Sequence, residues 1–75
     1  MKLIEAKLYQ NYIVKSNIIS DIKTRFRLLD MGLYSGANIC VLDRRKGKKN
    51  ILVAFNGVKY MLTSEIANMI EVENA

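Results

Sequence analysis

The dipeptide Asn56-Gly57 constrains the fold of this chain most, because it stands between two runs of alternating apolar residues. Asparagine and glycine tolerate the positive φ angles of a two-residue type I′ turn better than other residues do. Every second residue of each run is apolar and shares one face: Ile51, Val53 and Phe55 in the first run, and Val58, Tyr60 and Leu62 in the second. The pattern predicts a β-hairpin over Asn50–Phe55 and Val58–Thr63, with both faces in a shared core.

One helix is predicted upstream of this hairpin. Ser20 can accept hydrogen bonds from the free N–H groups of a helix that begins at Asp21, whose negative charge suits the positive helix end. Gly32 ends the helix, since glycine adopts the left-handed conformation there without a steric penalty. Apolar residues recur at i, i+4 and i+7 and lie on one face of it: Ile22, Phe26 and Leu29. Asp21 and Arg25 are four residues apart and can form an ion pair on the surface.

The remaining pattern is mainly of the β type. Further strands are predicted over Asn11–Ile18, Ala37–Arg44 and Ile70–Val72, with a helical turn from Thr63 or Ser64 through Met69. About five short strands with one short helix favour a small closed SH3-like β-barrel, because closure removes exposed sheet edges. The 75 residues contain no proline, repeat or low-complexity segment, so residues 1–75 are predicted to form a single domain.

Cysteine usage and hydropathy suggest a cytoplasmic protein. Cys40 is the only cysteine, so no intrachain disulfide can form. Glu5 and Lys7 interrupt the N-terminal apolar residues before a signal peptide could form. The longest apolar runs, Ile39–Leu42 and Ile51–Phe55, are far shorter than the roughly 20 residues that span a bilayer.

No catalytic or cofactor site is predicted. The chain has no histidine, which is the commonest general base, and Cys40 is interpreted as a small core residue in an apolar strand. Gly32 and Gly36 lack the spacing of a phosphate-binding or dinucleotide-binding loop. Three methionines are interpreted as residues that fill gaps in the core: Met31, Met61 and Met69.

No metal site is predicted either. The carboxylates are scattered instead of being clustered at ligand spacing: Glu5, Asp21, Asp30, Asp43, Glu65, Glu71 and Glu73. Iron(II) prefers sites with imidazole, carboxylate or thiolate ligands, and the imidazoles are missing.

The net charge of +5 is concentrated in one short segment. Its cations are Arg44, Arg45, Lys46, Lys48 and Lys49. The segment can be a solvated hairpin turn that bends at Gly47. It can also be a docking surface for an acidic protein or anionic lipid, or a nucleic-acid site. No nucleic acid is expected, because the four tyrosines do not cluster near this turn in sequence and stacking rings would be needed.

Leu33 and Tyr34 follow the helix stop. Leu33 is expected to pack in the core and Tyr34 to lie on the surface, although this pair could also line a groove together. SH3-like barrels often bind peptides in shallow aromatic grooves, so Tyr34, together with Leu33 and the basic segment, is a candidate partner contact.

The stretch from Arg27 to Leu33, Arg-Leu-Leu-Asp-Met-Gly-Leu, is followed by a turn at Gly36 and the strand Ile39–Leu42. This order resembles the family of ferrous iron transport protein A (FeoA), and the resemblance covers roughly Leu3 to Glu73. Two places depart from it. Ser35 stands where the family often has proline, and glycine is common in the segment 9–11, which here is Tyr-Gln-Asn.

The resemblance implies an SH3-like fold and a cytoplasmic accessory protein that is not an enzyme. Such a protein docks on the cytosolic GTP-binding region of the FeoB ferrous iron transporter and meets the membrane only through that transporter. The resemblance leaves open whether the chain also forms a homo-oligomer. The first alternative is a stand-alone module that binds or senses transition metal ions, because the same fold occurs as the C-terminal domain of metal-dependent repressors. The second is a small basic nucleic-acid-binding barrel that uses the 44–49 turn.

Overall fold

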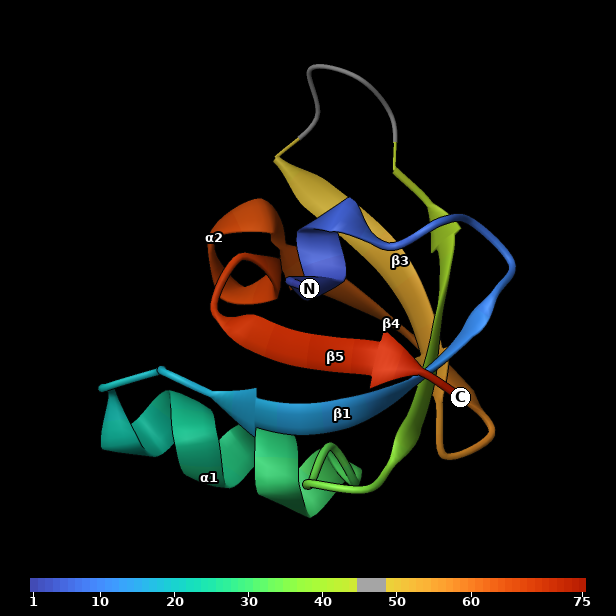
Figure 1. Cartoon of the computed structure of the whole chain (residues 1–75). Helices are drawn as coiled ribbons and strands as arrows, with labels where there is room; N and C mark the ends of the chain where they lie inside the picture. The colour runs from blue at the N-terminus through green and yellow to red at the C-terminus, as the bar shows by residue number, and fades with distance from the viewer. Residues whose placement is uncertain (45–48) are drawn as a thin grey trace.

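The computed structural model describes residues 1–44 and 49–75 of the chain (Figure 1). The elements are, in order, η1 (Leu3–Glu5), β1 (Asn11–Asn17), α1 (Ile22–Met31), β2 (Asn38–Asp43), β3 (Asn50–Phe55), β4 (Val58–Thr63), α2 (Ser64–Ala67) and β5 (Ile70–Asn74). Every predicted strand and helix is present, with ends within two residues of those expected. The short 3-10 turn η1 is an additional element.

The five strands form one antiparallel sheet in the order β4-β3-β2-β1-β5. The sheet curls around the core, and the mainly β, SH3-like fold is the predicted one (Figure 1). Complete closure is not observed, because β4 and β5 form the two edges of the sheet and do not pair with each other. The short helix α2 connects these two edge strands.

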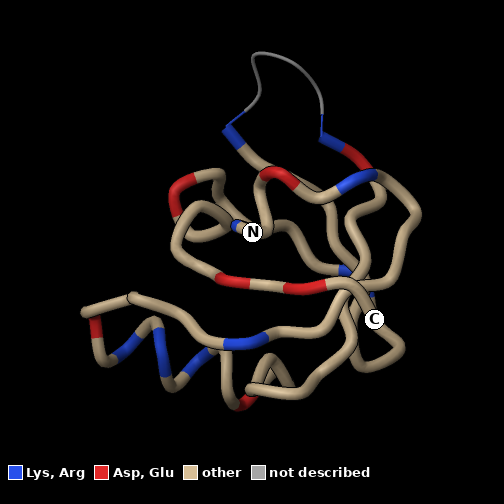
Figure 2. The backbone as a smooth tube through the Cα atoms, in the orientation of Figure 1, with Lys and Arg blue, Asp and Glu red and all other residues tan. Residues whose placement is uncertain are grey.

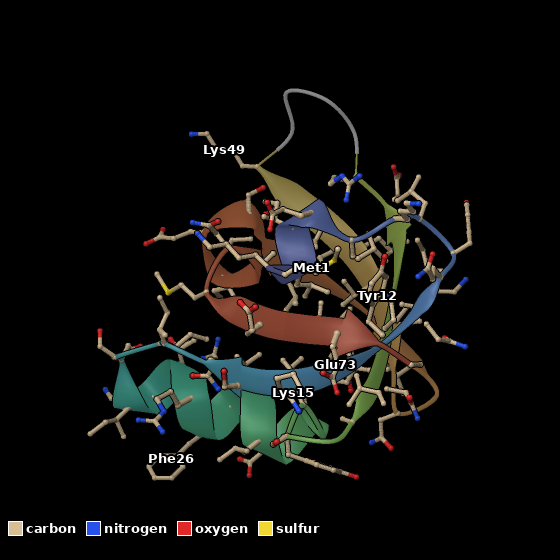
Figure 3. All side chains as sticks on the ribbon, viewed as in Figure 1. Met1, Tyr12, Lys15, Phe26, Lys49 and Glu73 are labelled. Carbon is tan, nitrogen blue, oxygen red and sulfur yellow. The ribbon has the colours of Figure 1, made fainter. Side chains whose placement is uncertain are left out.

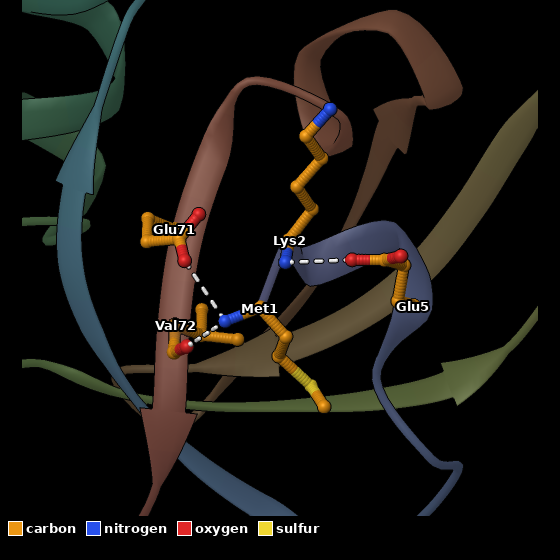
Figure 4. A network of polar contacts seen from close by, with 5 residues as sticks. All are labelled: Met1, Lys2, Glu5, Glu71 and Val72. Carbon is orange, nitrogen blue, oxygen red and sulfur yellow. Dashed lines mark hydrogen bonds and ion pairs between the residues drawn. The ribbon is translucent and has the colours of Figure 1, made fainter.

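The N-terminal segment covers the outer edge of β5. Backbone groups on that edge therefore find hydrogen-bond partners although the barrel is not closed. The N–H of Val72 donates to the carbonyl of Met1 at 2.7 Å, and the Met1 ammonium group donates to the carbonyl of Val72 at 3.0 Å. The same ammonium group lies 2.8 Å from Oε1 of Glu71, and Lys2 forms a β-bridge with Glu71. Figure 4 shows this network, in which the backbone N–H of Lys2 also donates to the Glu5 carboxylate.

The hairpin signal is confirmed. Asn56 and Gly57 have φ angles of 55° and 75°, as a type I′ turn requires. Phe55 pairs with Val58 beside the turn, and the register continues to Ile51 opposite Leu62. The rings of Phe55 and Tyr60 stack with centroids 4.6 Å apart. Val58 was expected on the core face but is exposed, since it lies on the edge strand β4, although its partner Phe55 on β3 is buried.

The helix α1 begins and ends at two well-defined caps. The N-cap is Asp21, one residue after the predicted Ser20, and its carboxylate accepts hydrogen bonds from the N–H and hydroxyl of Thr24. The ion pair expected between Asp21 and Arg25 is not observed. Gly32 has a φ of 100° and caps the other end, as predicted.

The core lies inside the curled sheet and is apolar, with no buried polar or charged residue in the part of the chain described. Its members are Leu3, Ala6, Tyr12, Val14, Ile19, Leu28, Leu33, Ile39, Val41, Ile51, Val53, Phe55, Leu62, Ala67, Ile70 and Val72. The hydroxyl of Tyr12 is satisfied there by the N–H of Lys7 at 3.0 Å (Figure 3). The neighbouring pair Lys15 and Glu73 joins β1 to β5 on the surface at 3.3 Å.

Two predicted core residues lie elsewhere. Cys40 is half-buried because it alternates with Ile39 and Val41, which take the core face of β2. Met61 is exposed on the outer face of β4 for the same reason. Met31 and Met69 are partly buried against the core, as expected.

Candidate docking surfaces

The turn between α1 and β2 presents Tyr34 to solvent. The N–H of Leu33 donates to the carbonyl of Leu28 at 2.9 Å, and the Leu33 side chain is buried. Tyr34, which is 58% exposed, projects from the same turn. Both placements agree with the expectation that Leu33 packs inward and Tyr34 lies outside, so Tyr34 is the member of the pair that a partner could touch.

Hydrogen bonds to β1 hold this turn in place. The N–H of Gly36 donates to the carbonyl of Val14 at 2.8 Å. The hydroxyl of Ser35 donates to the carbonyl of Lys15 at 3.0 Å. Ser35 therefore ties the turn to the sheet with a side-chain hydrogen bond that a proline at this position could not make.

The basic segment is only partly a free surface. The guanidinium of Arg44 donates to the carbonyls of Ile4 and Ala6, so it braces the N-terminal segment against the end of β2. Lys49 is exposed, and its carbonyl accepts the N–H of Ser64 at 2.6 Å. Arg45, Lys46 and Lys48 lie outside the described residues.

The two predicted contact regions do not form one site. In Figure 2 the segment that contains Tyr34 lies beside α1 at the bottom of the molecule, while Arg44 and Lys49 flank the undescribed segment at the top. The strand β2 separates them. Tyr34 and the 44–49 turn are thus two separate candidate contacts.

A third surface was not predicted, and it is the exposed apolar face of α1. Ile22, Phe26 and Leu29 share one face as expected, but all three are exposed and, with Arg25, line a shallow hollow. Figure 3 shows Phe26 pointing away from the sheet. The helix packs on the core through Leu28 instead. The apolar repeat was the available signal, but periodicity alone does not tell which face of a helix meets the core.

A fourth surface is a hollow on the outer face of the sheet. Its lining residues are Leu8, Tyr9, Leu42, Asp43, Leu52 and Lys59. Tyr9 is 75% exposed and has a φ of 61°, in the left-handed region that most side chains avoid. The N–H of Tyr9 donates to the carbonyl of Val41 at 2.8 Å, which holds the backbone there. One sign of this conformation was present in the sequence, because segment 9–11 lacks the glycine that is common there in the family that the chain resembles.

Hydrogen bonds from the hydroxyl and then the N–H of Thr24 hold the pKa of Asp21 below its ordinary value of 3.8. No group of three or more carboxylate, thiol or imidazole side chains lies close enough to hold a metal ion within residues 1–44 and 49–75. Over the same ranges, none of the helices has the length and apolar character needed to cross a membrane.

Several solved structures have the same fold as this chain. A crystal structure described as iron uptake regulatory protein (FeoA) is 28% identical, with a TM-score of 0.83, over 100% of this chain and 97% of that one. The solution structure of the FeoA protein from Chlorobium tepidum is 32% identical, with a TM-score of 0.89, over 99% of this chain and 70% of that one.

The same fold also forms part of larger proteins. A manganese-dependent transcriptional repressor is 21% identical with a TM-score of 0.89, and this chain covers 41% of it. A comparison with curated protein sequences gives no significant match. The FeoA domain family, in contrast, matches residues 1–74. The chain therefore belongs to the FeoA family.

Proposed function

We propose that this chain is a cytosolic accessory protein of ferrous iron uptake that docks on the GTP-binding region of a FeoB transporter. The observation that carries the proposal is the match of the FeoA domain family to nearly the whole chain. Solved relatives include one described as an iron uptake regulatory protein. Exposed apolar side chains on this small fold, such as Phe26 and Tyr34, are suited to a protein contact.

The mechanism would be association without catalysis. A partner that binds one state of a transporter better than another shifts the balance between those states by its difference in affinity. Apolar side chains would supply most of the binding energy, and the basic 44–49 turn would speed encounter with an acidic surface. Arg44 would contribute less than the other cations, because it holds the carbonyls of Ile4 and Ala6.

The test is an interferometry titration of this protein against the purified cytosolic region of the cognate FeoB, with GDP and with a GTP analogue. Saturable binding is expected. Tyr34→Ala should weaken it about threefold or more, mainly through faster dissociation, because an exposed aromatic contact is lost. Neutralising residues 45, 46, 48 and 49 to Gln, with Arg44 kept, should mainly slow association at low salt.

Met61→Ala is the matched control, because Met61 is exposed on the outer face of β4 and belongs to none of the predicted contacts. Its affinity should equal that of the unsubstituted protein. No binding in either nucleotide state, with the full-length transporter equally inert, would overturn the proposal. Stoichiometric Fe(II) or Mn(II) binding in anaerobic calorimetry would then favour the metal-binding alternative.

A further inference from the structure

The helix α1 carries apolar side chains on two faces, and only one of these faces meets the core. At about 100° per residue, the stripe of Ile22, Phe26 and Leu29 lies roughly opposite the stripe of Thr24, Leu28 and Met31. The second stripe is the buried or half-buried one. The first is exposed, and Phe26 alone leaves 62% of its surface to solvent. Because the outer face of this helix is also apolar, a second layer of structure can pack on it.

Two cations, Lys23 and Arg25, flank the exposed stripe, whereas Arg27 lies toward the opposite side of the helix. Lys23, Arg25 and Arg27 occupy the middle of the helix, and Asp21 and Asp30 stand at its two ends, as Figure 2 shows. Arg25 also lines the hollow beside Phe26. None of the three cations forms an ion pair with the residues that the structure describes. The charges of Lys23 and Arg25 are therefore available to a partner.

A second copy of the chain does not suit this face. Arg25 flanks the exposed stripe on one side near its middle, and Lys23 flanks it on the other. Two copies packed antiparallel through this stripe would bring their Arg25 side chains together, and two copies packed parallel would bring Arg25 of one beside Lys23 of the other. Like charges brought together this way weaken association, and strongly so where they are desolvated.

An anionic lipid surface also fits poorly. The stripe has the cations of a basic amphipathic helix, but Asp21 and Asp30 would approach the headgroups at both ends of it. Ile22, Phe26 and Leu29 line a hollow on this face, and insertion into a lipid surface does not require a hollow. Arg25 at its rim can take a carboxylate in a bidentate pair.

We infer that the exposed face of α1 is a docking site for an acidic amphipathic helix of a partner protein. The apolar side chains of that helix cover Phe26 and its neighbours in the manner of helix-in-groove recognition, and its carboxylates pair with Arg25 and Lys23. The inference depends on the docking function proposed above in one respect only, namely the identity of the protein that carries the helix. Tyr34 and the basic turn are not part of this face.

The test uses two stapled peptides of about 15 residues, because a shorter isolated helix would not hold its shape. Both carry the same leucine stripe, one flanked by glutamates and the other by lysines. In fluorescence anisotropy with the full chain, the glutamate peptide should bind saturably, and about tenfold or more tightly than the lysine peptide.

Substitutions then locate the site. Phe26→Ser should weaken the glutamate peptide about tenfold or more. Met61→Ser, at a side chain that is also 62% exposed, should leave it unchanged. Arg25→Glu should weaken the glutamate peptide and improve the lysine peptide, which a loss of folding would not do. Circular dichroism melts verify that each variant is folded.

The inference is overturned if both peptides bind equally or if Phe26→Ser leaves the affinity for the glutamate peptide unchanged. It is also overturned if anionic phosphatidylserine vesicles bind this face and neither peptide does, which would assign the face to a membrane. Concentration-dependent dimerisation that Phe26→Ser abolishes would assign it to a second copy. If the FeoB region binds and Phe26→Ser has no effect on it while the peptide results hold, the docking function stands and another protein carries the helix. If the FeoB region does not bind but the peptides behave as expected, only the proposed function fails.

Discussion

At the scale of single residues, Tyr9 stores conformational strain. Its backbone lies in the left-handed region, where a side chain other than glycine, asparagine or aspartate costs about 1 kcal/mol or more. Its ring is mostly exposed, so little packing offsets that cost. Replacing it with Asn, which tolerates this conformation, should raise the free energy of unfolding by about 0.5–1 kcal/mol.

The matched variant for this experiment is Tyr9→Val, since β-branched residues fit the left-handed region worst. It should be less stable than the unsubstituted chain, so that urea denaturation ranks Asn above Tyr and Tyr above Val. Equal stabilities for Asn and Val would show that no strain is stored at this position. A strained aromatic that persists beside a hollow is a sign of function, so Tyr9→Asn should also be tried against the FeoB region.

At the scale of elements, the start of α1 depends on the ionised Asp21. The pKa of this carboxyl is lowered by hydrogen bonds from Thr24, so its stabilising contribution is fully present above pH 3.8 and is lost as the pH falls through the lower folded-state pKa. Asp21→Ala should therefore lower Tm at pH 7, and the difference from the unsubstituted chain should shrink in acid below pH 3.8.

Two variants check the assignment to capping. Asp21→Asn keeps a side-chain acceptor, so it should lose less Tm than Asp21→Ala and show a weaker pH dependence. Asp30→Ala removes the same charge from the opposite end of the helix, where a carboxylate is unfavourable, and should not lower Tm. A pH-independent difference for Asp21→Ala would contradict the role of the ionised cap.

At the scale of the whole molecule, the end of α1 is fitted against the hairpin turn. A Cβ added to Gly32 would lie 2.9 Å from Nδ2 of Asn56, and Gly32 also has a φ of 100°. Gly32→Ala should therefore destabilise the chain by about 1–2 kcal/mol from the backbone alone, with a further loss from this contact. Chemical denaturation of the single variants and of the pair measures both parts.

A double-mutant cycle with Asn56→Gly separates the two causes. Glycine at position 56 keeps the positive φ of the turn and removes the amide that a Cβ at residue 32 would meet. The pair should recover about 0.5 kcal/mol or more of the loss, as a coupling between residues in contact. Strict additivity would mean that the backbone conformation of Gly32 accounts for the whole effect.

Much of the fold was determined by the sequence itself, because its signals are local. The Asn56-Gly57 turn, the glycine stop at residue 32 and the alternation of apolar residues in the strands each act within a few neighbouring residues. The FeoA resemblance, carried by the segment from Arg27 to Leu33, was confirmed by the family match. The separation of Leu33 in the core from Tyr34 on the surface also followed from sequence.

Only the tertiary structure decided which surfaces remain free. The repeat of Ile22, Phe26 and Leu29 defines one face of the helix, but whether that face meets the core depends on where the sheet lies. The sheet lies against the opposite face, where Leu28 is buried. Arg44 resembles its basic neighbours in sequence, yet contacts from the N-terminal segment occupy its guanidinium. Helical periodicity and charge are properties of a short segment, whereas burial and pairing depend on residues that are distant in the chain and meet only when it folds.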